Sequence, residues 1–263
     1  MTGASSLQFS DAVTEDAFLG GALGILQPKS GYRAGIDPVL LAASLGAADG
    51  ARVLDVGAGV GVAGLAAARR LPGTYVTLVE QNPGLAEIAR KNVARNAMTE
   101  RVQIIVADIT RPLSTCPELH ASAETFDHVL ANPPFMVEGR GTAADDPIKA
   151  AANAMPEGDL DRWVRFAASM LRPGGTLTLI HRPEALDAVL AALGGRFGGT
   201  AVVAVHPYEG KPAVRIFVRA TRASRAALVL MPGLVLHNAD RSFRADIEAV
   251  LRNGAALEVF ANR

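Results

Sequence analysis

Short apolar segments alternate with stretches of helical periodicity between residues 51 and 193, and this alternation restricts the possible folds most. The apolar segments are predicted strands at 52–56, 75–79, 102–106, 126–131 and 176–180. They are apolar along most of their length, which is typical of a parallel sheet covered by helices on both faces. A chain of 263 residues is long enough to bury such a core. We therefore predict an α/β fold with a mostly parallel sheet.

The pattern changes after residue 200. Thr200–Val205 and Ala213–Ala220 are predicted strands, and the short loop between them leaves no room for a helix. Two such strands pair antiparallel, so the predicted sheet has seven strands and ends in a C-terminal antiparallel hairpin. Residues 1–50 are expected to form an N-terminal extension packed on the core. Residues 51–220 then form the main domain, and residues 221–263 form a strand and helix tail of the same domain.

Composition excludes several classes of protein. No apolar run approaches the roughly 18 residues of a membrane helix, and acidic residues interrupt the N-terminal stretch where a secretory signal would lie. The single cysteine, Cys116, excludes intramolecular disulfides and Cys-rich zinc sites, and the five histidines show no metal-ligand spacing. Because 26 basic residues balance 26 acidic ones, the formal net charge is zero, and this argues against a protein that coats nucleic acid by charge alone. We expect a soluble, cytoplasmic protein without a metal site.

A glycine-rich segment follows the first strand of the main domain, at the edge where open α/β sheets bind ligands. Gly59–Gly64 fits the G-x-G-x-x-G pattern of dinucleotide-binding enzymes, but the first glycine of that pattern should directly follow the strand, which ends at Val56. The G-x-G-x-G pattern that begins at Gly57 fits the strand end better. It can bind a ligand such as S-adenosylmethionine through backbone amides. A turn that only lets a helix pack closely on the sheet is the structural alternative.

Three further strand ends carry polar groups. Glu80 ends the second strand and can accept hydrogen bonds from two ribose hydroxyls. Asp108 follows the third strand, where its carboxylate can accept from an adenine amino group. Asn132-Pro133-Pro134-Phe135 follows the fourth strand. A rigid Pro-Pro turn is the structural alternative for this last segment.

The Asn-Pro-Pro-Phe segment suits the methylation of an exocyclic amine on an aromatic base. The lone pair of such an amine is delocalised into the ring, so an enzyme must hold both N–H groups with acceptors and aim the nitrogen at the methyl carbon. The Asn132 side-chain oxygen and the Pro133 carbonyl can be these acceptors. Consecutive prolines fix the backbone, and Phe135 offers a flat face for stacking the base.

On these motifs the chain resembles class I S-adenosylmethionine-dependent methyltransferases with an Asn-Pro-Pro-[Phe/Tyr] motif. Within this group it resembles the bacterial tRNA adenine-N6 methyltransferases that modify valine tRNA. The resemblance covers nearly the whole chain, including segments 16–21, 27–28 and 31–37. It implies a Rossmann-like fold, S-adenosylmethionine as cofactor and tRNA as partner. The implied cofactor-binding residues are Asp55, Gly57, Ala58, Gly59, Gly61, Glu80, Gln81, Asp108 and Asn132, with Arg33 and Asp37 near the methionine end.

The same resemblance implies catalytic roles for Asn132, Pro133 and Phe135, with Pro134 and Phe135 beside the substrate. It leaves other acceptors open, because related enzymes methylate guanine N2 in ribosomal RNA or a glutamine amide in release factors. A nicotinamide-dependent oxidoreductase and a non-catalytic RNA-binding module are alternatives of other classes.

Three further features are a basic segment in the predicted hairpin, a candidate flap and a tryptophan. Lys211, Arg215 and Arg219 belong to the predicted hairpin, and the two arginines fall on one face of a strand. They are candidate phosphate ligands of an RNA, or a solvated face that discourages edge pairing. The segment 137–153 is a candidate flap over the substrate. Trp163 lies at core spacing on its helix, so we expect it to pack in the core.

Overall fold

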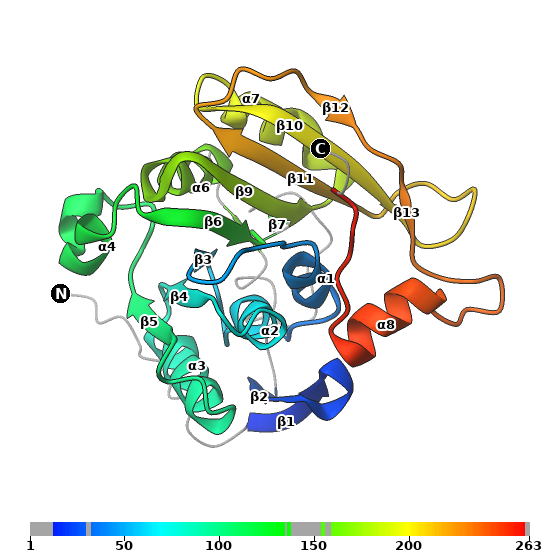
Figure 1. The fold of residues 1–263 in the computed structure, drawn as a ribbon, viewed down its shortest axis with the longest axis horizontal. Coiled ribbons are helices and arrows are strands. Elements are labelled where there is room, and N and C mark those ends of the chain that lie inside the picture. Colours follow the sequence, from blue (N-terminus) through cyan, green and yellow to red (C-terminus); the bar gives the residue numbers. More distant parts are fainter. Residues whose placement is uncertain (1–12, 30–32, 135, 138–153, 156–158, 261–263) are drawn as a thin grey trace.

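A nine-stranded sheet forms the centre of the protein, in a computed structural model that describes residues 13–29, 33–134, 136–137, 154–155 and 159–260 (Figure 1). Its strand order is β12-β10-β11-β9-β6-β3-β4-β5, and β13 also pairs with β10. The long strands of the sheet are β3 (Arg52–Val56), β4 (Tyr75–Glu80), β5 (Val102–Val106), β6 (Phe126–Ala131), β9 (Leu171–His181), β10 (Phe197–His206) and β11 (Arg215–Arg222). The two-residue strands β12 (Val229–Leu230) and β13 (Leu234–Val235) complete this sheet, while β1 (Val13–Phe18) with β2 (Leu23–Pro28) and β7 (Met136–Val137) with β8 (Ala154–Met155) form two separate two-stranded sheets.

The sheet confirms the predicted fold class. Strands β3, β4, β5, β6 and β9 are mutually parallel where they pair, and β11 runs antiparallel to both β9 and β10. The seven long strands are those predicted, and the two-residue strands β12 and β13 extend the sheet beyond them. Strand β9 begins at Leu171, five residues before the predicted start, because Leu171 pairs with Phe126 of β6. After a register shift, continuous pairing with β6 and β11 begins at Thr176, the predicted start.

Helices cover both faces of the sheet. The α-helices are α1 (Asp37–Ala43), α2 (Val62–Arg70), α3 (Pro83–Arg95), α4 (Pro117–Ala121), α6 (Asp159–Met170), α7 (Leu186–Leu193) and α8 (Ala245–Asn253). One apolar cluster joins α1, α2, α3 and α8 to the sheet, and a second joins α4, α6 and α7 to its other face. None of the helices in the described ranges is long and apolar enough to cross a membrane.

The start of α3 shows how local sequence sets an element boundary. Asn82 accepts hydrogen bonds from the backbone amides of Gly84 and Leu85, at 2.9 and 3.2 Å, so its side chain caps the helix. Pro83 occupies the first helical position, where no backbone donor is needed. This cap starts the helix directly after β4 and so fixes the strand end that carries Glu80.

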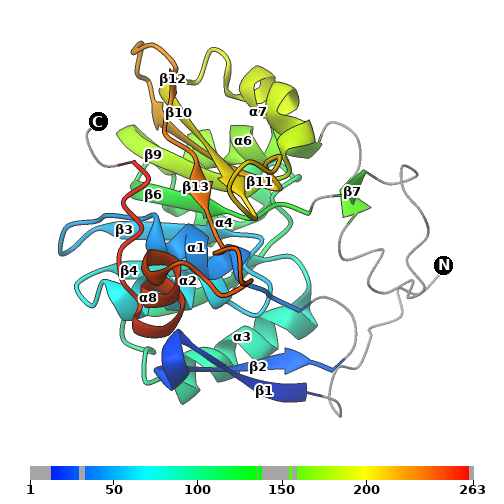
Figure 2. The same ribbon diagram turned by 90° about the vertical axis from the view of Figure 1, so that its right-hand side faces the viewer.

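The N-terminal extension contains a hairpin that the sequence did not predict. Strands β1 and β2 pair antiparallel, and Figure 2 shows them lying beside α3 at one end of the molecule. Asn92 of α3 is fully buried and connects this hairpin to the glycine segment. Its side chain accepts from the Leu26 amide at 2.7 Å and donates to the carbonyls of Leu26 and Val60, each at 3.0 Å. The hairpin is therefore bonded to the core through a buried side chain.

The C-terminal tail also packs on the core. The Leu257 amide donates to the Ala43 carbonyl at 2.8 Å, which joins the tail to α1. The Phe260 ring lies under the Arg219 guanidinium, 4.1 Å from its centroid. These contacts place the tail across β11 and α1.

Candidate functional site

The glycine segment turns sharply at the carboxyl end of β3. Gly57, Gly59 and Gly61 have φ values of +66°, +57° and +93°, a left-handed region that side chains disfavour. These are the three glycines of the G-x-G-x-G pattern. Gly64 instead lies inside α2, where a Cβ would come within 2.2 Å of a Leu78 methyl group, so it allows close helix packing. The loop geometry therefore favours the pattern that begins at Gly57.

Glu80 supports this loop from the neighbouring strand. Its carboxylate accepts from the amides of Gly59 and Asn82, both at 2.8 Å, one on each oxygen. Burial raises the pKa of Glu80, and the amide hydrogen bonds oppose this rise. A carboxylate has about four acceptor positions, and the amides of Gly59, Asn82 and Gln81 use no more than three, so acceptor capacity remains for a ligand hydroxyl. Gln81, the next residue, is exposed.

Asp55 lies beneath the loop and is 2% exposed. It accepts a hydrogen bond from the Gly64 amide at 2.8 Å, which fixes the first turn of α2. Burial raises the pKa of Asp55 to about 7, the Gly64 hydrogen bond opposes the rise, and the charge of Glu80 adds to it. Because it is buried and bonded to Gly64, Asp55 supports the loop from inside the protein and is not on the loop surface.

Asp108 is more accessible, with its side chain 36% exposed. It accepts from the amide and the hydroxyl of Thr110, at 2.9 and 2.7 Å, on the same oxygen. The other oxygen lies 3.7 Å from Arg111 Nε. One side of the carboxylate is thus held by the loop while the residue remains reachable from solvent.

Asn132 follows β6 directly, at the same edge of the sheet as the glycine loop. Its Oδ1 atom is buried and has no hydrogen-bond partner among the described residues. A buried acceptor without a partner costs about 1–3 kcal/mol, so such groups are uncommon outside functional sites. Pro133 is buried beside it and Pro134 is half-buried. Phe135 and residues 138–153 of the expected flap lie outside the described residues.

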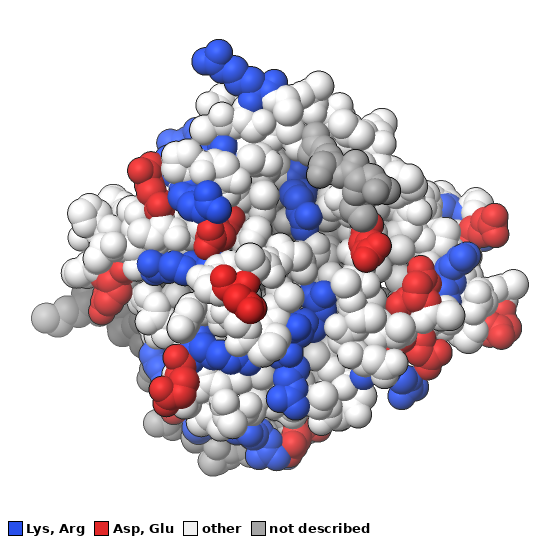
Figure 3. Space-filling view, in the orientation of Figure 1, with Lys and Arg blue, Asp and Glu red and all other residues white. Residues whose placement is uncertain are grey.

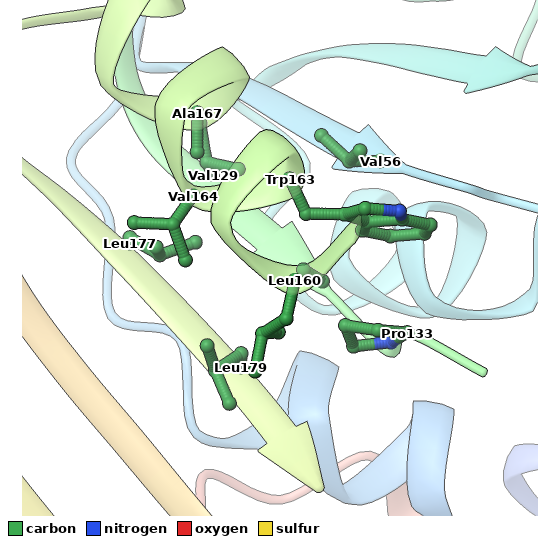
Figure 4. Close-up of a pocket in the computed structure, with 10 residues that line it drawn as sticks. Val56, Val129, Pro133, Leu160, Trp163, Val164, Ala167, Leu177 and Leu179 are labelled. Atoms are coloured by element: carbon green, nitrogen blue, oxygen red, sulfur yellow. The ribbon is translucent and has the colours of Figure 1, made fainter. Parts of the chain in front are cut away.

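Trp163 packs against the apolar cluster between α6 and the sheet, as the sequence predicted, and it also contacts the glycine loop. It lies on α6 and lines a small apolar pocket with Val56, Pro133, Leu160 and other side chains of β3, β6, β9 and α6 (Figure 4). A Cβ on Gly57 would come within 2.2 Å of Trp163 Cη2, so the indole rests on the first glycine of the loop. Helical periodicity cannot reveal this contact, because the two residues are 106 positions apart in the chain.

Arg33 and Asp37 do not pair with each other. Arg33 forms an ion pair with Asp16 and donates to the Thr14 hydroxyl at 2.6 Å. Asp37 forms an ion pair with Arg215 at 2.8 Å. Both side chains are therefore engaged in bonds that tie the N-terminal segments to their neighbours.

Arg219, a candidate phosphate ligand of the hairpin, contacts other parts of the chain. Its guanidinium donates to the Ser44 carbonyl and to the Thr178 hydroxyl, and it lies over the Phe260 ring. Burial lowers the pKa of Arg219 to about 10. The residue lies on the same strand face as Arg215, as predicted, but the tail and α1 cover this face.

Lys211 is exposed in the loop between β10 and β11. Figure 3 shows that Lys and Arg on the viewed face are interrupted by Asp and Glu. That face therefore presents mixed charge rather than a continuous basic surface.

Comparison with known proteins places this geometry in context. The family model of the methyltransferase small domain matches residues 35–207. A tRNA1(Val) (adenine(37)-N6)-methyltransferase of Aeromonas hydrophila is 30% identical over 220 residues, covering 82% of this chain and 86% of that protein. A release factor glutamine methyltransferase of Mycolicibacterium smegmatis is 32% identical over 180 residues, 66% of this chain and 60% of that protein. The solved structure of a predicted O-methyltransferase from Agrobacterium tumefaciens has a TM-score of 0.69 and 33% identity, and the match covers 84% of this chain and 98% of that one.

Coverage differs among the relatives. The chain spans between about half and two thirds of the length of the first curated relatives that it matches. One of these is a tRNA1(Val) (adenine(37)-N6)-methyltransferase of Bacteroides thetaiotaomicron, 27% identical over 62% of this chain and 65% of its own length.

Proposed function

This chain belongs to the methyltransferase small domain family, and from that premise we propose that it transfers the methyl group of S-adenosylmethionine to the N6 amine of an adenine in tRNA. S-adenosylmethionine supplies an activated methyl group on its sulfonium. The protein's task is then to bind this cofactor, orient the amine and keep water from the methyl carbon.

The described residues fit the cofactor. The left-handed turns of Gly57, Gly59 and Gly61 leave the loop free of side chains at these positions, so its backbone can approach a ligand closely. Glu80 is fixed by backbone amides and keeps acceptor capacity for a ribose hydroxyl. Asp108 stands at the next strand end, where it can accept from the adenine amino group.

The single observation that supports amine methylation best is the unpartnered Oδ1 atom of Asn132. A buried oxygen without a partner is free to accept a hydrogen bond from a ligand, and an amine N–H would supply one. The Pro133 carbonyl is the proposed second acceptor. With both N–H groups held, the nitrogen lone pair is directed away from the acceptors and toward the methyl carbon.

The choice of tRNA adenine is supported by the relatives that this chain resembles over most of its length. A glutamine amide in a protein is the second candidate, because release factor glutamine methyltransferases are also among the relatives. An aryl amine and an amide have similar N–H groups, so Asn132 alone does not choose between them. We place the reaction in the cytoplasm, where tRNA is found.

The test supplies radiolabelled S-adenosylmethionine together with separated tRNA, ribosomal RNA and protein fractions. We expect label in tRNA, and nucleoside mass spectrometry should then identify N6-methyladenosine. Label in the protein or ribosomal RNA fraction instead would contradict the proposed acceptor. Calorimetry that detected binding of NAD but not of S-adenosylhomocysteine would contradict the proposed cofactor.

Asn132→Ala tests the role of the unpartnered oxygen. We expect turnover to fall at least 100-fold, the range seen when one oriented hydrogen-bonding group is removed from an active site. Affinity for S-adenosylhomocysteine should change little, because the glycine loop and Glu80 remain. Asn238→Ala removes an amide from an exposed turn and is the matched control. Near-normal turnover of Asn132→Ala would refute the assigned role.

A further inference from the structure

Trp163 flanks the buried inward stripe of α6 and packs against the same apolar cluster, with its side chain partly exposed. The stripe consists of Leu160, Val164 and Ala167, which pack on the sheet. Helical side chains point back toward the start of their helix. Trp163 is in the first half of α6, so its indole extends toward the edge of the sheet where β3 and β6 end. Figure 4 shows the ring between Val56 and Pro133.

The ring is interlocked with the glycine loop. Three of its atoms, Cη2, Cζ3 and Cζ2, lie 2.2, 3.0 and 3.2 Å from the position of a Cβ on Gly57. No side chain fits at residue 57 while the indole stays in place. The loop and the indole are therefore in direct contact at the first glycine.

The same ring reaches the Asn132 motif. Pro133 and Trp163 line one pocket, and Pro133 directly follows Asn132. The indole thus stands at the junction between the glycine loop and the amine acceptor. It is half-buried, so part of it remains available to a ligand.

This junction is where the charged sulfur of the cofactor must lie if the proposed function is right. The cofactor is held by the glycine loop, and the methyl carbon must reach a nitrogen held by Asn132. A sulfonium carries a positive charge, and the face of an indole attracts cations more strongly than other aromatic rings. Asp55 lies below the loop and is bonded to Gly64, so it does not occupy the junction.

We infer that Trp163 is a further cofactor-binding residue whose indole contacts the sulfonium by a cation–π interaction. This inference rests on the proposed function. It has a consequence for specificity: the site should distinguish S-adenosylmethionine from S-adenosylhomocysteine, whose sulfur is neutral. A structural role in packing would not make this distinction.

The test compares the affinities of the two compounds by calorimetry in the wild-type protein, Trp163→Phe and Trp163→Leu. We expect Trp163→Leu to weaken S-adenosylmethionine binding about tenfold more than S-adenosylhomocysteine binding, a shift that corresponds to a desolvated cation–π contact. Trp163→Phe keeps an aromatic face and should keep most of the preference. Thermal unfolding with circular dichroism checks that each variant is folded.

Phe166→Leu is the matched control, because it removes an aromatic ring from the same helix at a buried position of the core. Its ratio of affinities should equal that of the wild type. A parallel loss of both affinities in Trp163→Leu, or no loss, would overturn the inference. Failure of the wild type to bind either compound would instead refute the proposed function, so the two failures are distinguishable.

Discussion

The contact between Gly57 and Trp163 leads to a quantitative prediction. Gly57→Ala places a methyl group at a φ of +66°, which costs about 1–2 kcal/mol for an L residue. The same methyl would lie 2.2 Å from Trp163 Cη2, and overpacking of this kind costs about 1–3 kcal/mol. The total destabilisation should be about 2–5 kcal/mol. In a Trp163→Ala background the steric part vanishes and only the backbone part remains.

The measurement is a double-mutant cycle of urea unfolding at constant pH. The free-energy cost of Gly57→Ala should be about 1–3 kcal/mol smaller in the Trp163→Ala background than in the wild type. Gly61→Ala is the control, because its methyl group would meet Leu78 and Leu65 rather than the indole. Its cost should be the same in both backgrounds within about 0.5 kcal/mol. An equal cost of Gly57→Ala in both backgrounds would show that the ring and the loop do not interlock.

Three further predictions concern buried polar groups. Burial raises the pKa of Asp55 from 3.8 to about 7, so the folded protein holds a proton that the unfolded chain releases, and stability should fall as pH rises from about 4 to about 7. Asp55→Asn should flatten this fall in urea titrations at several pH values, and an unchanged slope would contradict the assignment. Arg219→Leu should reduce the free energy of unfolding by about 2–3 kcal/mol, because it removes charge-assisted hydrogen bonds. Its tRNA affinity in filter binding should be unchanged. Weaker RNA binding by the folded variant would show that Arg219 contacts phosphate. Asn92→Leu removes three hydrogen bonds to Leu26 and Val60 and should cost about 3 kcal/mol in the same unfolding assay, whereas a loss below about 1 kcal/mol would show that these bonds are individually unimportant.

The parallel strands were the most predictable part of the fold. The bounds of β3, β6 and the partly exposed edge strand β5 agree with the predicted segments, because a largely apolar run between turn residues marks a strand. The β1–β2 hairpin was missed, since Glu15 and Asp16 interrupt the apolar pattern of a half-exposed strand. Its Gly20-Gly21 turn was the available signal for a hairpin.

The candidate site was predictable only where it depends on strand order. Glu80 ends β4 and Asn132 directly follows β6, and these strands run parallel, so the topology alone brings both residues to one edge. Side-chain contacts between segments that are far apart in the chain leave no comparable pattern in the sequence. Period-two alternation puts Arg219 on a face with Arg215, but it cannot tell that the tail brings Phe260 over that face. The placement of Trp163 depends in the same way on how α6 docks against the sheet.

The position of Trp163 has a practical consequence, because it is the single tryptophan of the chain. Light absorbed selectively by indole at the red edge of the protein spectrum excites one ring, and that ring touches the glycine loop. Its emission is therefore a built-in optical probe of one place in the molecule, free of signal from other indoles. Rapid-mixing measurements can follow events at this loop in real time without an attached dye.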